Sequence, residues 1–230
     1  MSELQAPSIA FFDVDGTLVN GVVGLYASLR LVKHGVLKKR RIFQALYFSL
    51  ADLVVRQDVE AIYHIATADM AGEPLSRMYA IGRESLEKDT KPRLYAEGLA
   101  AIRAHQARGD HVYLLSSGPY LVLDHLRDDL GLTGSYGVGP VTENSILTSR
   151  LITPLCYGAG KVHYATLAAE SHAIPLSKCH FYTNDAIDLP LLKRVGFPNP
   201  VNPDRPLRQT AREQQWPILY FKETQGREVA

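Results

Sequence analysis

The sequence predicts an α/β fold with a doubly wound parallel sheet and an inserted α-helical cap. Short apolar runs end in clusters of polar residues, as where Ile9-Ala10-Phe11-Phe12 leads into Asp13-Val14-Asp15. These runs alternate with segments whose apolar residues recur every three or four positions, which is typical of amphipathic helices. Alternating strands and helices predict a parallel sheet covered on both faces, and one long, purely helical segment predicts an insert.

The first strand and the helical insert come early in the chain. Residues 9–12 are wholly apolar, which predicts a buried strand. Residues 25–85 have helical spacing and lack strand signals, so we expect three or four helices there. Lys91-Pro92 ends this block, because proline removes a helix hydrogen bond. We therefore expect a core formed by residues 1–20 and 92–230 and a helical cap formed by residues 21–91.

The second half of the chain alternates between strands and helices. Helices are expected over residues 94–106, 120–130 and 161–171, with Gly131 ending the second of them. Strands are expected at 111–115, 180–183, 195–201 and 218–221, a turn-rich stretch at 134–139 and a short hairpin at 147–154. In such sheets the ligand site lies beyond the carboxyl ends of the strands, where the polar clusters of this chain fall.

Composition excludes several classes of protein. The 230 residues carry 25 Lys and Arg against 24 Asp and Glu, a net charge of +1 that argues against a dedicated nucleic-acid binder. A hydrophobic fraction of 46% argues against disorder. The two cysteines, Cys156 and Cys179, predict no disulfide framework. We find no secretory signal and no apolar run of about 20 residues, so we expect a cytoplasmic protein.

Four polar clusters follow the predicted strands and helices in a characteristic order: Asp13/Asp15, Ser116, Lys161, and Asn184-Asp185 with Asp188. They resemble the four motifs of the haloacid dehalogenase (HAD) superfamily, within its subclass similar to phosphoserine phosphatases. The resemblance covers nearly the whole chain and implies a Rossmann-like core. It also implies a Mg²⁺-dependent phosphatase that works through an aspartyl-phosphate.

The resemblance assigns roles that the chemistry supports. Asp13 would be the nucleophile and Asp15 the acid and base. Phosphoryl transfer requires positive charge and fixed donors around the phosphate, and Ser116, Ser117, Gly118 and Lys161 would bind it. Mg²⁺ prefers oxygen ligands, which carboxylate and amide side chains near the first and fourth motifs would supply. The expected metal ligands are Asp13, Asp15, Asn184, Asp185 and Asp188.

Two departures from the family pattern leave alternatives open. Asn184 stands where the family usually has Asp, so metal affinity is expected to be weaker, and Asp185 is an alternative ligand. The chain also lacks an acidic residue shortly after the first motif, which makes phosphoserine an unexpected substrate. We expect hydrolysis of a small phosphomonoester. The alternatives are transfer to an acceptor other than water and a catalytically weakened binding or regulatory module.

The first part of the predicted cap carries basic residues but no acidic ones. Residues 16–51 contain no Asp or Glu, yet Lys38-Lys39-Arg40-Arg41 precedes an apolar run at 42–55. A solvated basic turn before a buried helix explains this most simply. The alternatives are a phosphorylated amphiphile as substrate or a contact with an anionic membrane surface. We expect no nucleic-acid partner, and the sequence does not predict an oligomeric state.

Overall fold

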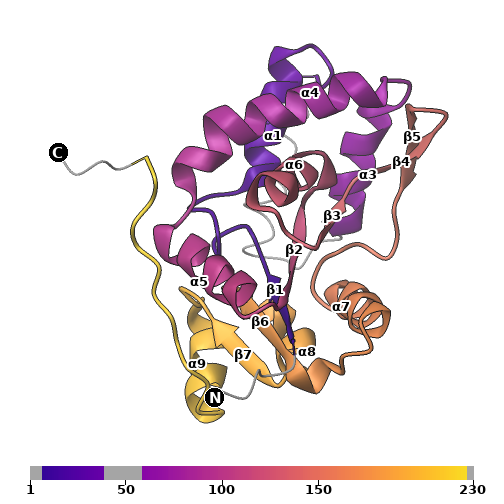
Figure 1. Ribbon diagram of the computed structural model, residues 1–230. Coiled ribbons are helices and arrows are strands. Elements are labelled where there is room, and N and C mark those ends of the chain that lie inside the picture. Colours follow the sequence, from indigo (N-terminus) through magenta and orange to yellow (C-terminus); the bar gives the residue numbers. More distant parts are fainter. Residues whose placement is uncertain (1–6, 39–58, 227–230) are drawn as a thin grey trace.

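The computed structural model describes residues 7–38 and 59–226 (Figure 1). Most of the basic turn and the apolar run at 42–55 lie outside these residues. The strands are β1 (Ile9–Phe12), β2 (His111–Pro119), β3 (Gly134–Val138), β4 (Pro140–Glu143), β5 (Ile146–Leu151), β6 (Cys179–Thr183) and β7 (Phe197–Pro200). The α-helices are α1 (Val23–Lys33), α3 (Val59–Met70), α4 (Leu75–Ser85), α5 (Ala96–Ala107), α6 (Tyr120–Leu130), α7 (Gly160–Ser171), α8 (Leu189–Leu192) and α9 (Arg205–Glu213).

The predicted doubly wound sheet is confirmed. Five parallel strands run in the order β3-β2-β1-β6-β7. Alternate residues of β1 point to opposite faces, so Phe12 packs toward α5 and α6 while Phe11 packs toward α7, α8 and α9. Helices α5 and α7 lie on opposite sides of the sheet in Figure 1. This arrangement buries both faces and leaves the carboxyl ends of the strands for a site.

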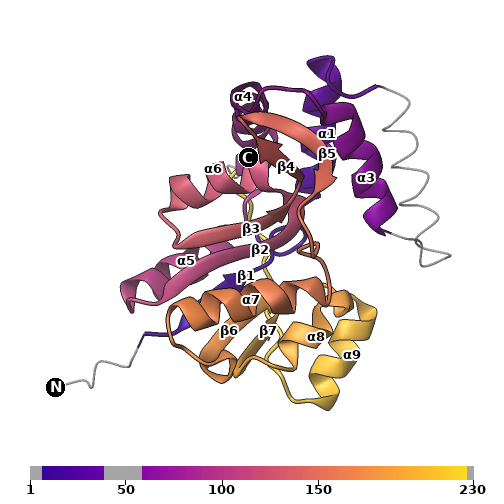
Figure 2. The same cartoon turned by 90° about the vertical axis from the view of Figure 1, so that its right-hand side faces the viewer.

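The helices α1, α3 and α4 gather at one end of the molecule (Figures 1 and 2). A π-helical turn (Leu86–Thr90) and a 3-10 turn (Lys91–Arg93) continue α4 and end the helical segment at the expected place. The apolar cluster of these helices includes Met70 and Met78, but also Leu121 of α6 and Leu147 of β5. The helical insert therefore shares its apolar core with the sheet domain. Because the two parts are packed together, the boundaries of the cap at residues 21 and 91 remain a prediction.

An antiparallel hairpin, β4–β5, joins the sheet domain to the helical insert. Its turn follows Glu143, and the backbone of Leu147 exchanges hydrogen bonds of 2.8 and 2.9 Å with Gly72 and Glu73, in the loop between α3 and α4. The hairpin was expected at 147–154 but forms earlier. The shift arises because Asn144 and Ser145 both adopt positive φ and form the turn.

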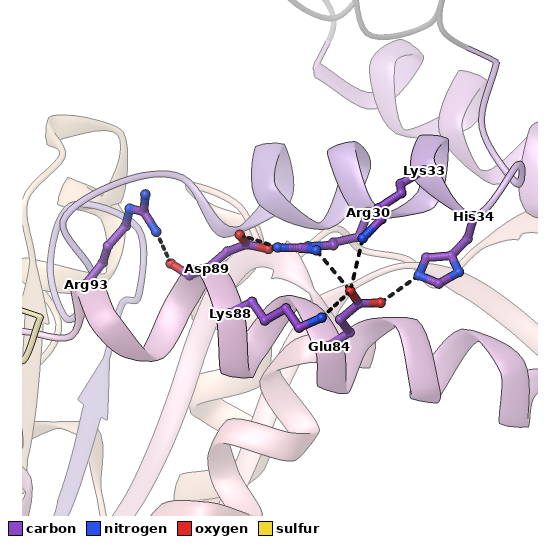
Figure 3. Close-up of polar contacts among 7 residues, drawn as sticks. All are labelled: Arg30, Lys33, His34, Glu84, Lys88, Asp89 and Arg93. Carbon is purple, nitrogen blue, oxygen red and sulfur yellow. Dashed lines mark hydrogen bonds and ion pairs between the residues drawn. The ribbon is translucent and has the colours of Figure 1, made fainter.

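Ion pairs tie α1 to the end of α4 (Figure 3). Arg30 donates to Glu84 at 2.9 Å and to both carboxylate oxygens of Asp89 at 2.7 and 2.8 Å. Lys33 approaches Glu84 at 3.7 Å. Two cations of the acid-free stretch are thus neutralised within the molecule, whereas Lys38 is exposed. The role of the basic turn remains a prediction, since residues 39–41 lie outside the described part.

Two predictions about the sheet edges were wrong. The stretch 134–139 contains an edge strand, β3, because its glycines serve close packing: a Cβ on Gly134 would lie 2.4 Å from the Tyr113 ring, and one on Gly137 would lie 2.8 Å from Gly118 O. The strand expected at 218–221 is absent, and Leu219 forms only an isolated bridge with Val201.

No helix within residues 7–38 and 59–226 is long and apolar enough to cross a membrane. Both cysteines, Cys156 and Cys179, are buried and free, as the sequence predicts.

Candidate active site

The predicted site residues come together at the carboxyl ends of three adjacent strands. Asp13 directly follows β1, Ser116 lies in the C-terminal half of β2, and Asn184 directly follows β6. Strand β1 lies between the other two, so their ends form one edge. Lys161 reaches the same place from the first turn of α7. The order of the strands therefore brings together residues that are far apart in the chain.

Lys161 lies at the centre of this cluster. Its Nζ is 2.9 Å from Asp13 Oδ1 and 2.7 Å from Asp188 Oδ2, and its side chain is almost completely buried. Burial alone would lower the pKa of Lys161, but the charges of Asp13 and Asp188 outweigh burial and raise the pKa. Lys161 therefore remains a cation at neutral pH and holds the two carboxylates together.

The two carboxylates of the first motif differ in their partners. Burial raises the pKa of Asp13 to about 7, although Lys161 opposes this shift. Burial also raises the pKa of Asp15 to about 6, against the hydrogen bond of 2.8 Å that the Val23 amide donates to Asp15 Oδ1. Lys161 Nζ thus pairs with the carboxylates of Asp13 and Asp188, and Asp15 lies close enough to add to the pKa shift of Asp13, so negative charge is in excess here. Burial is the largest cause of both raised pKa values, and further positive charge would lower them and favour the ionised forms.

Asn184 packs against the turn that follows Asp15. Gly16 has a φ of +70°, and a Cβ at this position would lie 2.3 Å from Asn184 Nδ2. Thr17 Oγ1 donates to Asn184 Oδ1 at 3.3 Å. Glycine is therefore required at position 16 for two reasons, the left-handed backbone and the approach of the amide. This contact fixes the amide beside the first motif.

The C-terminal part of β2 presents donors suited to an anion. Ser116 is fully buried, and its Oγ accepts a hydrogen bond of 3.0 Å from the Gly118 amide, which leaves the hydroxyl proton for another acceptor. The Ser117 carbonyl accepts a hydrogen bond of 2.8 Å from Tyr63 of α3. Tyr63 thereby connects the helical insert to the predicted phosphate-binding segment.

The two acidic residues that follow Asn184 have different surroundings. Asp188 is completely buried, and its Oδ2 also accepts a hydrogen bond of 2.7 Å from Thr183 Oγ1. Its Oδ1 is buried without a hydrogen-bond partner among the described residues. Asp185 is exposed and accepts a 2.9 Å hydrogen bond from the Ile187 amide, so it caps the turn that carries Asp188.

The donor set fits a magnesium ion. No three His, Cys, Asp or Glu side chains in the described ranges converge closely enough to hold a metal by themselves. Mg²⁺ commonly keeps several waters and needs only one or two carboxylates, so amide, main-chain and water oxygens would complete its ligands. The unpartnered Asp188 Oδ1 and the excess negative charge are both features that a divalent cation would relieve.

Three participants escaped prediction from the sequence. Thr183 precedes Asn184 directly, and its position at a strand end was a usable signal. The other two participants have no such signal. Almost any residue at position 23 would supply the same main-chain N–H, and Tyr63 is far from every motif along the chain.

Comparison with known proteins agrees with this geometry. The chain belongs to the haloacid dehalogenase-like hydrolase family, whose model matches residues 10–193. It is 30% identical over 229 residues to phosphoserine phosphatase SerB1 of Mycobacterium tuberculosis, covering 96% of this chain and 74% of that protein. It is 25% identical to a histidinol-phosphatase of Neisseria meningitidis, covering 94% of this chain and 99% of that protein.

A solved structure from Bordetella pertussis, of a protein with unknown function, has the same fold. Its TM-score is 0.83 at 20% identity, covering 93% of this chain and 99% of the other. The family model and the relatives named phosphatases establish this chain as a hydrolase of the phosphatase type.

Proposed function

We propose that this protein hydrolyses a phosphomonoester through an aspartyl-phosphate on Asp13, with Mg²⁺. The observation that carries the proposal is the ion-pair chain Asp13–Lys161–Asp188, with distances of 2.9 and 2.7 Å, buried at the carboxyl edge of the sheet. A purely structural salt bridge would gain little from such burial, because desolvation offsets most of the Coulombic attraction. A reacting phosphoryl group needs this arrangement, because it brings negative charge next to the nucleophile.

In the proposed reaction, Asp13 attacks phosphorus and the bond to the leaving alcohol oxygen breaks. Asp15 donates a proton to that oxygen, for which a pKa of about 6 is suited near neutral pH. Asp15 then takes a proton from water, which attacks the aspartyl-phosphate and releases inorganic phosphate with Asp13 restored. The Val23 amide holds Asp15 Oδ1, so the other oxygen is left for proton transfer.

The phosphate would be held by Ser116, by the Ser117 amide and by Lys161, while the Gly118 amide, which donates to Ser116 Oγ, would orient that hydroxyl. The Ser116 hydroxyl keeps its proton available because its oxygen already accepts from Gly118. Lys161 offsets charge on the phosphate while remaining paired with Asp13 and Asp188. These groups orient the phosphoryl group for attack and stabilise the charge that develops on its oxygens.

Mg²⁺ would be held by Asp13, the main-chain oxygen of Asp15 and Asn184, with Asp188 and Asp185 nearby. When bound, it would neutralise phosphate charge and lower the pKa of Asp13, so that the carboxylate is ionised for attack. Asp185 would act mainly by capping the turn that positions Asp188. Asn184 contributes an oxygen without charge, so we expect weaker metal affinity than an Asp would give.

The test is release of inorganic phosphate from p-nitrophenyl phosphate and a panel of phosphomonoesters, with Mg²⁺ and with EDTA. The panel includes phosphoserine and histidinol phosphate, which the names of the relatives suggest. Asp13→Asn should abolish release, whereas Asp128→Asn, an exposed carboxylate on α6, should leave it intact. Full activity of folded Asp13→Asn would refute the proposal.

Two other outcomes correspond to the alternatives. Release of the alcohol from the ester without matching release of inorganic phosphate, in the presence of added acceptors, would indicate a phosphotransferase. Absence of turnover for every ester, together with failure to bind beryllofluoride in Mg²⁺, would indicate a regulatory module.

A further inference from the structure

An apolar cavity lies between the helical insert and the sheet domain. The space between its walls, counted together with open solvent at its mouth, is about 700 Å³, of which about 100 Å³ is accessible to the centre of a water-sized sphere. Helices α1, α3 and α4 form three of its sides, and α6 with the loops around β3 and β4 forms the rest. None of the described residues that line it is charged, and its walls are mainly aliphatic: Ala27, Leu31, Leu37, Ala66, Met70, Met78, Ile81, Leu121, Val122 and Val138.

The hydroxyl groups on three of the cavity-lining residues are already engaged. Ser28 Oγ donates to the Gly24 carbonyl at 2.7 Å, and Tyr63 donates to the Ser117 carbonyl at 2.8 Å. Thr67 Oγ1 donates within α3, to the carbonyl of Tyr63 at 3.0 Å. Their protons are therefore not available to a ligand. A ligand with amine or hydroxyl groups would lose its bonds to water here and gain few in return.

The cavity adjoins the candidate active site. Ser117, which belongs to the segment proposed to bind phosphate, lines it, and so does Pro119 directly after Gly118. Gly24 lines it too, next to Val23, whose amide donates to Asp15 Oδ1. These shared and neighbouring residues place the cavity beside the position proposed for a phosphoryl group at Asp13.

We propose that the cavity receives the aliphatic chain of the substrate, so that the enzyme acts on phosphate monoesters of long-chain alcohols. This inference rests on the proposed phosphatase function and narrows its substrate class. The chain enters past Ser117 and runs between α1 and α3, while the phosphate stays at Asp13 and Lys161. An amino-alcohol phosphate such as phosphoserine would place a charged amine at the mouth of this uncharged cavity.

The helices that line the cavity set its length. Gly24 and Leu31 lie seven positions apart on α1, as do Tyr63 and Met70 on α3, which corresponds to about 10 Å at ~1.5 Å per residue. An extended peptide spans about 3.6 Å per residue, and each residue contains three backbone bonds, which gives about 1.2 Å per bond. We take the same advance per bond for an extended alkyl chain. The cavity therefore accommodates a chain of about eight carbons.

The test is the series of straight-chain alkyl phosphates from ethyl to dodecyl, each below its micelle concentration, with Mg²⁺. Each methylene that enters the cavity should raise kcat/KM by about fourfold, up to a length near eight carbons, after which the increase should stop. Equal kcat/KM along the series, or a preference for phosphoserine over octyl phosphate, would overturn the inference while leaving the phosphatase proposal intact. No hydrolysis of any ester would instead refute the proposed function.

A variant that fills the cavity tests its location. A Cβ on Gly24 meets only Pro119 Cδ, at 4.0 Å, so this position tolerates a side chain, and Gly24→Leu would add bulk at a residue that lines the cavity. It should remove most of the dependence on chain length. Leu29→Phe is the control, because Leu29 is half exposed on the same helix and does not line the cavity. It should keep the dependence, and an unchanged slope in folded Gly24→Leu would place the chain elsewhere.

A binding measurement separates affinity from turnover. Octylphosphonate, which cannot be hydrolysed, should bind the Mg²⁺-loaded protein with a more negative heat-capacity change than methylphosphonate, because it buries apolar surface. Equal heat-capacity changes for the two ligands would also overturn the inference.

Discussion

Replacing Lys161 by Met removes the cation that holds the buried carboxylates together. Its ammonium lies 2.9 Å from Asp13 and 2.7 Å from Asp188, and all three side chains are less than a tenth exposed. Removing one partner of a buried pair leaves uncompensated charge and costs about 3–5 kcal/mol. In a protein of this size that cost corresponds to a fall in Tm of about 6–20 °C.

The effect should depend on pH in a defined direction. Lys161 opposes the upward shift of the Asp13 pKa, so its removal raises that pKa above about 7. At about pH 5 Asp13 is protonated in both proteins and adds little to the difference, whereas at about pH 8 the folded variant must keep a proton that the unfolded chain has released, so the destabilisation is larger.

The assay is thermal unfolding of the metal-free protein at both pH values, with Lys88→Met as control. Lys88 also pairs with a carboxylate, Glu84, at 2.9 Å, but it is 58% exposed, so its loss should cost at most about 1 kcal/mol. Equal Tm values for Lys161→Met and the wild type at about pH 8 would refute this reasoning. The variant should also lose phosphatase activity, because among the described residues Lys161 is the side chain that forms an ion pair with Asp13 and is proposed to offset the phosphate charge.

Three further predictions concern the same site. Metal-free wild type should lose stability as pH rises from about 4 to about 7, because the folded state retains a proton on Asp13 that the unfolded chain releases; Asp13→Asn should flatten that slope in thermal melts. Gly16→Ala should raise the Mg²⁺ concentration required for activity, whereas Gly72→Ala, with φ of +88° but no atom within 4 Å of the added Cβ, should cost only about 1–2 kcal/mol in stability; equal Mg²⁺ requirements would contradict the proposed contact. Tyr63→Phe leaves the Ser117 carbonyl without its donor and should cost about 1–3 kcal/mol in chemical denaturation; an unchanged midpoint would show that this bond contributes nothing.

The sequence predicted the central strands and most helices because their signals are local. Strand β1 is an apolar run that ends in polar residues, and α6 ends at Gly131, which adopts the left-handed conformation with φ of +60°. The meeting of Asp13 and Asn184 was predictable too, because the carboxyl ends of neighbouring parallel strands share one edge, whereas Lys161 on α7 and Asp188 beyond β6 were expected there from the resemblance to the family's motifs.

The remaining features depend on contacts between distant segments. Gly134 and Gly137 resemble turn residues in sequence, yet they lie in β3 because neighbouring side chains and backbone leave no room for a Cβ. Tyr63 reaches the site only after the helical insert folds over the sheet domain, and Arg30 finds Asp89 in the same way. The cavity likewise has walls from seven elements, which are α1, α3, α4, β2, α6, β3 and β4, so no single stretch of sequence reveals it.

The most direct test of the central claim is chemical trapping of the intermediate. Enzyme mixed with a ³²P-labelled phosphomonoester and Mg²⁺ is quenched in acid, digested, and its labelled peptide identified by mass spectrometry. We expect an acid-stable, hydroxylamine-sensitive phosphoryl group on Asp13 that accumulates in Asp15→Asn, because Asp15 activates the water that removes it. Turnover by the wild type with no label on Asp13, or with the label on another residue, would contradict the account.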